Sequence, residues 1–390
     1  MTTVLIRGLA GLVTGRLGEP FVETDSLLLE SGRIASIGDG ASGSDAVVVL
    51  DAAGAIAAPG LIDSHSHVVF GDWTPRQQTI GWIESTVHGG VTTLMSASEV
   101  HLPGRPSDPA GVKALALAAH RSYAAFRPGG MKVLGGSVII EPGLTEDDFA
   151  ELAREGVWLA KVGFGAWSPQ GAAAPAVRSA QRCGFLVMTH TGGASIPGSS
   201  PVTIDDVVTL GADIIGHANG GTTALPDGDL PRLIDETKGT IQLVQAGNLR
   251  SALAILGLAR ERGALGRIVI ATDTPSGTGV MPLGMIKSVV ELSSLGDLAP
   301  TDALALATGN AGAALRLEQG VLEVGRPADV VLLQAPLGGS KSDALAAIAN
   351  GDIPSIVGTV IDGVPRAFRS RNTPAPIREV IVEKNAEVRT

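Results

Sequence analysis

Two of the seven histidines in the chain, His65 and His67, stand one residue apart at the end of an apolar segment, AAPGLIDSHSHVVF. In a β-strand, residues i and i+2 point to the same side, so the two imidazoles would lie side by side. Imidazoles placed in this way can form half of a metal site. The alternative is a hydrated strand end, and the other chemistry-bearing residues must decide between the two.

Four more such residues lie in, or at the end of, short apolar segments. They are Lys161 in VWLAKVGF, His190 in FLVMTH, His217 in ADIIGHA and Asp273 in RIVIATD. Burying a lysine is costly unless its charge is paired or removed, and a salt bridge to a loop carboxylate is the ordinary alternative. Four imidazoles, a carboxylate and an amine that converge favour a metal centre, because a bound cation compensates the cost of burying them.

The charges in such a centre suggest a role for Lys161. Two divalent cations held by four neutral imidazoles and one carboxylate leave an excess of positive charge, which an ammonium group would increase. Carboxylated by carbon dioxide, the lysine becomes an anionic carbamate with one oxygen for each cation. Low polarity and nearby cations lower the lysine pKa from about 10.4 and supply the neutral amine that this reaction needs.

Strands alternating with helix-length segments would position these residues. The strands are GLIDSHSH, VTTLMSAS, MKVLGGSVII, VWLAKVGF, FLVMTH, ADIIGHA, TIQLVQAG and RIVIATD. Helical periodicity appears between them, as in DPAGVKALALAAHRSYAAF. The alternation over residues 60–312 predicts an α/β fold with a (β/α)8 TIM barrel, whose active groups lie at the C-terminal ends of the strands. A doubly wound sheet is the alternative, but its GxGxxG fingerprint is absent from the start of this region.

Both ends of the chain contain short strands instead. TVLIRG, DSLLLESG, RIASIG and AVVVLDA lie near the start, and ADVVLLQA and SIVGTVIDGVPRAF lie near the other end. Neither set is long enough to bury a good core alone. We therefore predict a small β-sandwich domain built from residues 1–56 and 319–390, with the catalytic barrel at 57–318. The charged, proline-containing segment 370–390 is predicted to be a surface tail that can meet another subunit.

Composition limits the classes of partner. The chain has 390 residues, of which 44 % are hydrophobic, and a formal net charge of -10. This charge argues against nucleic acid or an anionic membrane surface as a partner. The one cysteine, Cys183, excludes an internal disulfide and a thiolate cluster. No apolar run approaches the roughly 20 residues of a membrane span. We predict a cytoplasmic protein that acts on a small molecule.

The GLIDSHSH segment, the lysine strand, the two single-histidine strand ends and the aspartate strand resemble the amidohydrolase superfamily. ESGRIASIG and EVGRPADVVLL are similar to the two halves of its β-domain. The resemblance covers nearly the whole chain. It implies that His65, His67 and Asp273 bind one divalent ion, and that His190 and His217 bind the second. Carboxylated Lys161 would bridge the two ions.

The chain also resembles one group within this superfamily, the enamidases. The segments that carry this resemblance are THTGGASIPGSSPVTIDD, GHANGG, ATDTPSGTGVMPLGMIK and NGDIPSI. Enamidases are cyclic-amide hydrolases of nicotinate degradation. The resemblance implies a homotetramer that opens 6-oxo-1,4,5,6-tetrahydronicotinate to 2-formylglutarate and ammonia. It also implies a zinc ion with zinc or iron at the second position, although the same donors accept manganese or nickel.

The hypothesis for the mechanism is attack on the ring carbonyl by a hydroxide that bridges the two ions. Asp273 would take its proton and pass it to the departing nitrogen. The substrate carboxylate needs a donor-rich contact. The SGTG segment that begins at Ser276 could form an anion-holding nest, although simple turns explain its glycines equally well. The other candidates, each of which can also lie on a solvated face, are Arg105, Arg250 and Lys287.

Alternatives stay open at this stage. The same binuclear site supports dipeptide, hydantoin or lactone hydrolysis. Deamination is disfavoured, because deaminases of this superfamily generally use one metal ion and lack the bridging lysine. A non-catalytic scaffold that kept the barrel is a further alternative, but such relatives usually lose metal ligands and all six positions are filled here. The remaining histidines are assigned to the surface or to packing: His88, His101 and His120.

Overall fold

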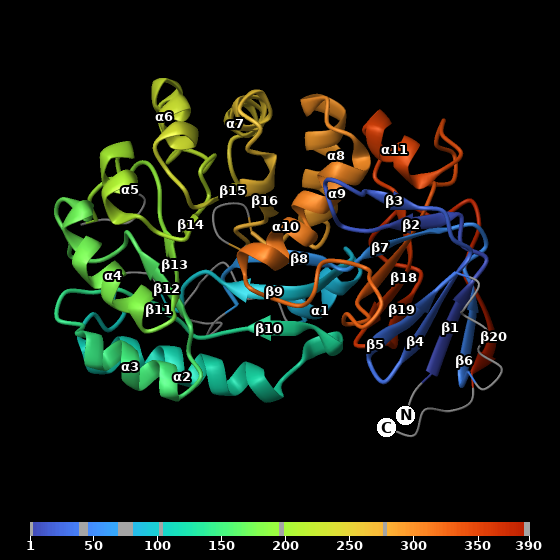
Figure 1. Ribbon diagram of the computed structural model, residues 1–390, viewed down its shortest axis with the longest axis horizontal. Coiled ribbons are helices and arrows are strands. Elements are labelled where there is room, and N and C mark those ends of the chain that lie inside the picture. The colour runs from blue at the N-terminus through green and yellow to red at the C-terminus, as the bar shows by residue number, and fades with distance from the viewer. Residues whose placement is uncertain are drawn as a thin grey trace.

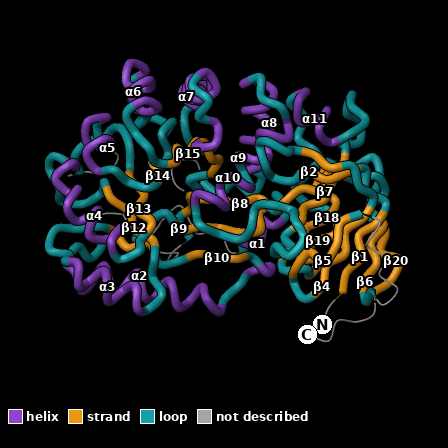
Figure 2. The backbone as a smooth tube through the Cα atoms, in the orientation of Figure 1, coloured by secondary structure: helices purple, strands orange, loops and turns teal. Residues whose placement is uncertain are grey.

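The computed structural model describes residues 3–38, 46–68, 81–100, 104–194, 199–275 and 279–385. Helices surround short strands in one part of the molecule, and two β-sheets lie at the other end beside both termini (Figure 1). The tube in Figure 2 shows the same division, with the helices gathered away from the two sheets. The predicted α/β class is confirmed.

Parallel strands that carry the candidate residues form two sheets. The three-stranded sheet has the order β10 (Lys132–Leu134), β9 (Val91–Ser96) and β8 (Leu61–Ser66). The six-stranded sheet has the order β11 (Ser137–Ile139), β12 (Leu159–Val162), β13 (Leu186–Thr189), β14 (Ile214–Ile215), β15 (Thr240–Val244) and β16 (Ile268–Ala271). Because neighbouring strands in each sheet pair parallel, their C-terminal ends lie at one side.

The two parallel sheets approach each other at both of their outer edges. MKVLGGSVII, predicted as one strand, is divided into β10 and β11 at Gly135 and Gly136, where a side chain on Gly136 would meet the helix backbone at Ala116. At the other edge, Ser66 and Thr274 form a parallel bridge that sets the end of β8 beside the segment after β16. Chain segments far apart in sequence therefore meet at this edge.

Helices follow most of the parallel strands, and polar caps start several of them. Thr145 and Thr203 each form a capping box, with Asp148 and Asp206 respectively. The α-helices are α1 (Trp82–Val87), α2 (Pro109–Ala125), α3 (Glu146–Arg154), α4 (Ala174–Arg182), α5 (Ile204–Leu210), α6 (Leu230–Asp235), α7 (Leu249–Glu261), α8 (Gly284–Gly296), α9 (Pro300–Leu306), α10 (Gly309–Ala314) and α11 (Ala344–Asn350).

Two more sheets combine both ends of the chain. One has the order β20 (Ile381–Asn385), β6 (Val48–Asp51), β1 (Thr3–Arg7), β4 (Ser26–Glu30) and β5 (Arg33–Ile37). The other has the order β19 (Val364–Phe368), β18 (Ser355–Ile361), β17 (Val330–Gln334), β7 (Ile56–Pro59), β2 (Gly11–Val13) and β3 (Phe21–Val22). A single hydrophobic cluster contains Ile6 and Leu29 from the first sheet and Leu332 and Val360 from the second.

The C-terminal segment differs from the prediction of a surface tail. Within residues 370–390, β20 pairs antiparallel with β6 and completes an edge of the first sheet. Pairing satisfies the backbone groups that β6 would otherwise present at an open edge. The charged composition of the segment hid this strand, because Ile381 and Val382 stay largely exposed even when paired.

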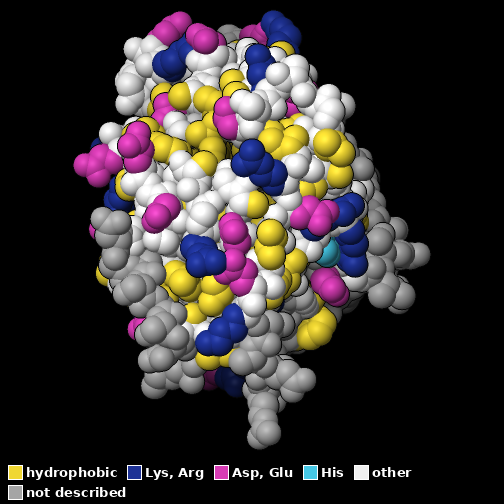
Figure 3. Space-filling model, turned by 90° about the vertical axis from the view of Figure 1, so that its right-hand side faces the viewer, with side chains coloured by type: hydrophobic (Ala, Val, Ile, Leu, Met, Phe, Trp, Pro, Cys, Tyr) yellow, Lys and Arg dark blue, Asp and Glu magenta, His cyan; other side chains and the backbone are white. Residues whose placement is uncertain are grey.

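The face of the molecule at this end mixes apolar and charged side chains (Figure 3). The exposed apolar residues of the two end sheets include Phe21, Val22, Ile381 and Val382, from strands β3 and β20. Among the helices in the described ranges, none is both long enough and apolar enough to cross a membrane.

A buried ion network joins the parallel strands to the other two sheets. Lys132, at the start of β10, lies 2.7 Å from Asp329 and 2.6 Å from Asp362, which precede β17 and follow β18. Asp329 is 2 % exposed, and its carboxylate also accepts the backbone N–H of Asp362 at 2.9 Å. Removing the cation would leave a buried carboxylate without a counter-ion.

We expect Lys132→Met to lower the free energy of unfolding by about 3 kcal/mol, because breaking one side of a buried ion pair strands the other. Thermal unfolding monitored by circular dichroism measures the loss. Arg182→Met is the matched control: its ion pair with Glu146 has both side chains more than half exposed, and such pairs contribute at most about 1 kcal/mol. Equal shifts in the two variants would contradict the prediction.

Candidate metal centre

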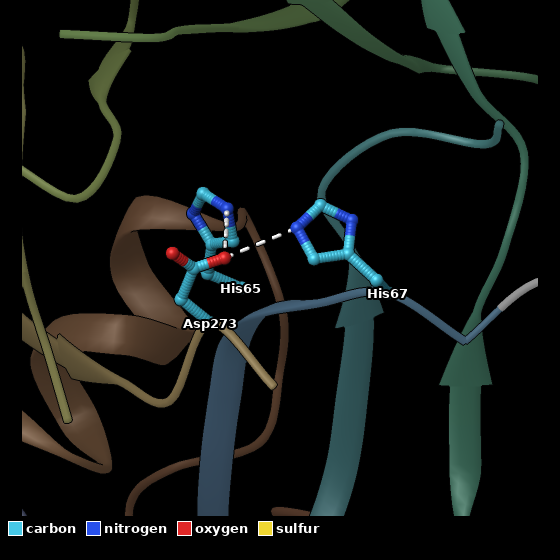
Figure 4. A group of neighbouring side chains, drawn as sticks. All are labelled: His65, His67 and Asp273. Atoms are coloured by element: carbon cyan, nitrogen blue, oxygen red, sulfur yellow. Dashed lines mark hydrogen bonds and ion pairs between the residues drawn. The ribbon is translucent and has the colours of Figure 1, made fainter. Parts of the chain in front are cut away.

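His65, His67 and Asp273 form one group at the ends of β8 and β16. Asp273 Oδ1 lies 3.4 Å from His65 Nε2 and 3.1 Å from His67 Nε2. One ligand atom from each of the three lies within 4.8 Å of the others. Figure 4 shows the carboxylate directed between the two imidazoles. Two imidazoles and a carboxylate at such distances are a donor set that suits a transition-metal dication.

His190 and His217 form a second group beside the first. His190 Nδ1 lies 2.9 Å from His217 Nε2, and their ring centroids are 4.5 Å apart. His217 also contacts His65, with ring centroids 5.2 Å apart. His217 Nδ1 is buried, and it has no hydrogen-bond partner among the described residues. An orphaned buried nitrogen of this kind also fits a site built for a cation.

Lys161 in β12 is completely buried. Its Nζ donates to Met188 Sδ at 3.2 Å and lies 5.5 Å from the centroid of the Phe164 ring. Burial lowers the pKa of the lysine to about 7, although the negative charge of Asp273 opposes this shift. The predicted alternative of an ordinary salt bridge finds no support, because no carboxylate of the described residues pairs with Nζ.

Burial also keeps three of the imidazoles neutral, those of His65, His190 and His217. Desolvation, followed by the positive charge of Lys161, lowers the pKa of His190 to about 4 and that of His65 well below its usual value. Desolvation and then His190 have the same effect on the pKa of His217. Neutral imidazoles are the form that binds metal ions.

Asp273 behaves in the opposite way. Burial alone would raise its pKa, but His65 and His67 hold the pKa below the usual range. Its backbone lies in the left-handed region, with φ 58°, and its N–H donates to His65 O at 2.8 Å. His217 also has a positive φ, of 33°. Such conformations in non-glycine residues concentrate at functional sites.

Two buried polar residues near the centre, Asp63 and Gln242, are not among the candidates predicted from the sequence. Asp63 in β8 accepts from the backbone N–H of Thr272 at 2.9 Å, which ties the two strands that carry His65 and Asp273. Gln242 in β15 contacts His65 Nδ1 at 2.8 Å. Each is a polar residue inside an apolar strand, GLIDSHSH or TIQLVQAG, and this position is the feature of the sequence that could have indicated a role for it.

The other predicted residues lie elsewhere. Ser276 and His101 fall outside the described residues. Arg250 pairs with Asp227 and its side chain is 78 % exposed, and Lys287 pairs with Glu291. His88 accepts from the backbone N–H of Arg371, and His120 packs near Gly156, so neither belongs to the centre.

Arg105 differs from the other basic candidates because it is partly buried and lies near the centre. Its side chain is 9 % exposed and forms an ion pair with Glu141. It also donates to Phe164 O at 3.5 Å, and the Phe164 ring lies 4.7 Å from the ring of His190. Phe164 therefore lies between the guanidinium of Arg105 and the imidazole of His190 and contacts both residues.

A model of the amidohydrolase family matches residues 56–365. The chain belongs to the amidohydrolase family. It is 45 % identical to enamidase from Eubacterium barkeri over 377 residues, which cover 96 % of this chain and 98 % of the relative. The predicted recognition of the superfamily, with a likeness to enamidase, is confirmed, and so is the prediction of a hydrolase.

Comparison with solved structures agrees. The crystal structure of enamidase aligns with a TM-score of 0.93 and 44 % identity, and covers 98 % of this chain and 100 % of that chain. Molinate hydrolase aligns with a TM-score of 0.62 at 17 % identity over 93 % of this chain and 94 % of that chain, which shows the fold alone. Adenine deaminase from Deinococcus deserti is 25 % identical over 85 % of this chain and 56 % of its own length.

The buried lysine leads to a prediction about stability. The pKa of Lys161 is about 7 in the folded chain, against 10.5 for an exposed lysine in the unfolded chain. Between these pH values the unfolded chain therefore binds a proton at this residue more tightly. Metal-free wild type should therefore gain stability from this lysine as the pH rises through that window, by about 1.4 kcal/mol per pH unit. Lys161→Met has no such dependence, so it should be more stable than wild type at pH 7, by an amount that shrinks towards pH 10.

Chemical denaturation of both metal-free proteins at several pH values measures this difference. Titrating groups that do not interact with Lys161 contribute equally to both proteins and cancel. Lys113→Met is the control, because Lys113 pairs with Asp148 and Glu151 near the surface. A difference between wild type and Lys161→Met that stays constant with pH would show that Lys161 is not held neutral.

Proposed function

We propose that the chain is a metal-dependent hydrolase that opens a cyclic amide, as the name of its relative enamidase implies. The observation that supports this best is the grouping of His65, His67 and Asp273 at the strand ends, next to the buried amine of Lys161. A likeness of 45 % identity over nearly the full length of enamidase supports the substrate class.

In this proposal His65, His67 and Asp273 hold one divalent ion, and His190 and His217 hold the second. Carboxylated Lys161 would supply a ligand to each of the two ions. We propose zinc at one position and zinc or iron at the other. When bound, the ions polarise the ring carbonyl and lower the pKa of a water molecule that attacks it.

Asp273 is the proposed proton carrier. Because Asp273 is ionised, its carboxylate could accept a proton from the attacking water and deliver it to the ring nitrogen as the C–N bond breaks. For 6-oxo-1,4,5,6-tetrahydronicotinate the released nitrogen is an enamine. This group tautomerises to an imine, and a second water molecule then displaces ammonia and leaves the aldehyde 2-formylglutarate.

Arg105 is the proposed contact for the substrate carboxylate. It is the buried member of the three basic candidates, and its neighbour Phe164 covers His190. The guanidinium offers several donors in a fixed plane, which suits a carboxylate. Glu141 already accepts from it, so the substrate would share the cation with this residue.

We also infer the finer fold. The contacts between β8 and the segment after β16, and the short gap between β10 and β11, support a closed (β/α)8 barrel at 57–318. The hydrophobic cluster shared by the two end sheets supports a β-sandwich from 1–56 and 319–390. Exposed Phe21 and Ile381 are consistent with the homotetramer, which light scattering tests. A cytoplasmic location stays a prediction.

We expect Asp273→Asn to keep bound metal ions but lose about 100- to 10,000-fold in kcat, which is the usual contribution of a positioned acid or base. Asp297→Asn is the matched control, because Asp297 also has a positive φ but is 98 % exposed. Metal content by mass spectrometry and turnover are measured on the same samples. Near-normal turnover of Asp273→Asn would refute the role as proton carrier.

We expect Arg105→Met, made together with Glu141→Gln so that no buried charge is stranded, to raise KM for a ring carboxylate about 10- to 100-fold. This range corresponds to losing one hydrogen bond to a charged group. KM for the corresponding carboxamide should hardly change. Arg250→Met is the control. An equal rise in KM for both substrates would point to a general disturbance instead.

A substrate panel tests the function itself. Lactams, hydantoins, lactones and dipeptides are supplied to metal-replete protein, and aldehyde and ammonia are measured separately. Aldehyde and ammonia formed together from the unsaturated lactam support the proposal. Turnover of dipeptides, hydantoins or lactones alone would favour another reaction of the same family, and ammonia without an aldehyde would favour deamination.

A further inference from the structure

Gln242 lies in β15, has no exposed surface, and bridges to strand β8. Its Nε2 donates to Ser64 O at 2.9 Å and lies 2.9 Å from Ser64 Oγ. Its Oε1 lies 2.8 Å from His65 Nδ1. A buried amide therefore connects the backbone just before the first candidate ligand with the imidazole of that ligand.

These contacts allow one orientation of the amide. The carbonyl oxygen of Ser64 can only accept, so the amide nitrogen of Gln242 must face it. The amide oxygen then faces His65, and an amide oxygen can also only accept. His65 Nδ1 must therefore carry the proton of the neutral ring. A reversed amide would set its oxygen against the carbonyl oxygen of Ser64 at 2.9 Å, where neither atom can donate, and this repulsion disfavours it.

The tautomer of His65 follows from this orientation. With the proton on Nδ1, the lone pair of the neutral imidazole is on Nε2. His65 Nε2 is buried, has no hydrogen-bond partner among the described residues, and lies 3.4 Å from Asp273 Oδ1. The ring nitrogen that faces His67 and Asp273 is therefore the one that is free to bind a cation.

We propose that Gln242 is a positioning residue that fixes the tautomer and ring orientation of His65, so that Nε2 is ready to bind the metal ion shared with His67 and Asp273. The inference rests on the proposed metal-dependent function. A neutral amide holds the ring without adding negative charge, unlike the carboxylates that often orient metal-binding histidines. This choice leaves His65 a weaker donor than a carboxylate-paired imidazole would be.

Gln242→Met tests the proposal, because methionine fills a similar volume but accepts no strong hydrogen bond. We expect one of the two metal ions to bind about 10- to 100-fold more weakly, the usual effect of removing such a partner. The dissociation constants are measured by chelator competition with zinc. The melting temperature of the metal-free protein is measured beside them.

Gln245→Met is the matched control. Gln245 follows the same strand but contacts Ser288 and Glu291 instead of a candidate ligand, so zinc affinity should stay at the wild-type value. Gln242→Glu is nearly isosteric and keeps an acceptor for His65 Nδ1. It should bind zinc at least as tightly as wild type.

The outcomes separate this inference from the proposed function. Wild type that binds no zinc refutes both. If wild type binds two zinc ions and Gln242→Met binds them with the same affinity, only the role of Gln242 is refuted. An equal loss of both ions, with a lower melting temperature of the metal-free protein, shows a packing role and overturns the proposal. Weaker binding by Gln242→Glu overturns it independently, even if the methionine variant fails to fold.

Discussion

The meeting of β8 with the segment after β16 is the constraint on which the rest of the centre depends. Asp63 accepts from Thr272, and the backbone N–H of Asp273 donates to His65 O at 2.8 Å. These bonds join residues that are about two hundred positions apart in the chain. Without them the carboxylate of Asp273 would have no fixed relation to the two imidazoles of β8.

Burial then decides the chemistry of the groups that this contact gathers. Removing water favours the neutral form of imidazoles and amines, so His65, His190, His217 and Lys161 all have lowered pKa values. Asp273 keeps its charge, because the hydrogen bond that it accepts from His67 favours the ionised form. An anion beside neutral donor atoms favours the binding of a cation.

The site is also costly for the fold, and the cost is localised. A buried lysine with a thioether as its hydrogen-bond partner, an orphaned His217 nitrogen and two positive-φ ligand candidates would each destabilise an ordinary core. Strands β12, β13 and β16 are buried along their whole length, and a separate ion network at Lys132 fixes the parallel strands to the end sheets. Rigid packing elsewhere compensates for strain at the centre.

The class of the fold, the family and the six candidate residues could be predicted from the sequence alone. Strand ends are readable because apolar runs and turn residues are local features, and His65, His67, His190, His217, Asp273 and Lys161 all lie in or just after such runs. Only the tertiary structure decided which partners surround them. Gln242 reaches His65 from 177 positions away, β20 completes a sheet at the far end of the chain, and Arg105 alone of three basic candidates is buried near the imidazoles. Such contacts depend on how the strands pack against one another in space. No local pattern of residues encodes which distant residues come into contact.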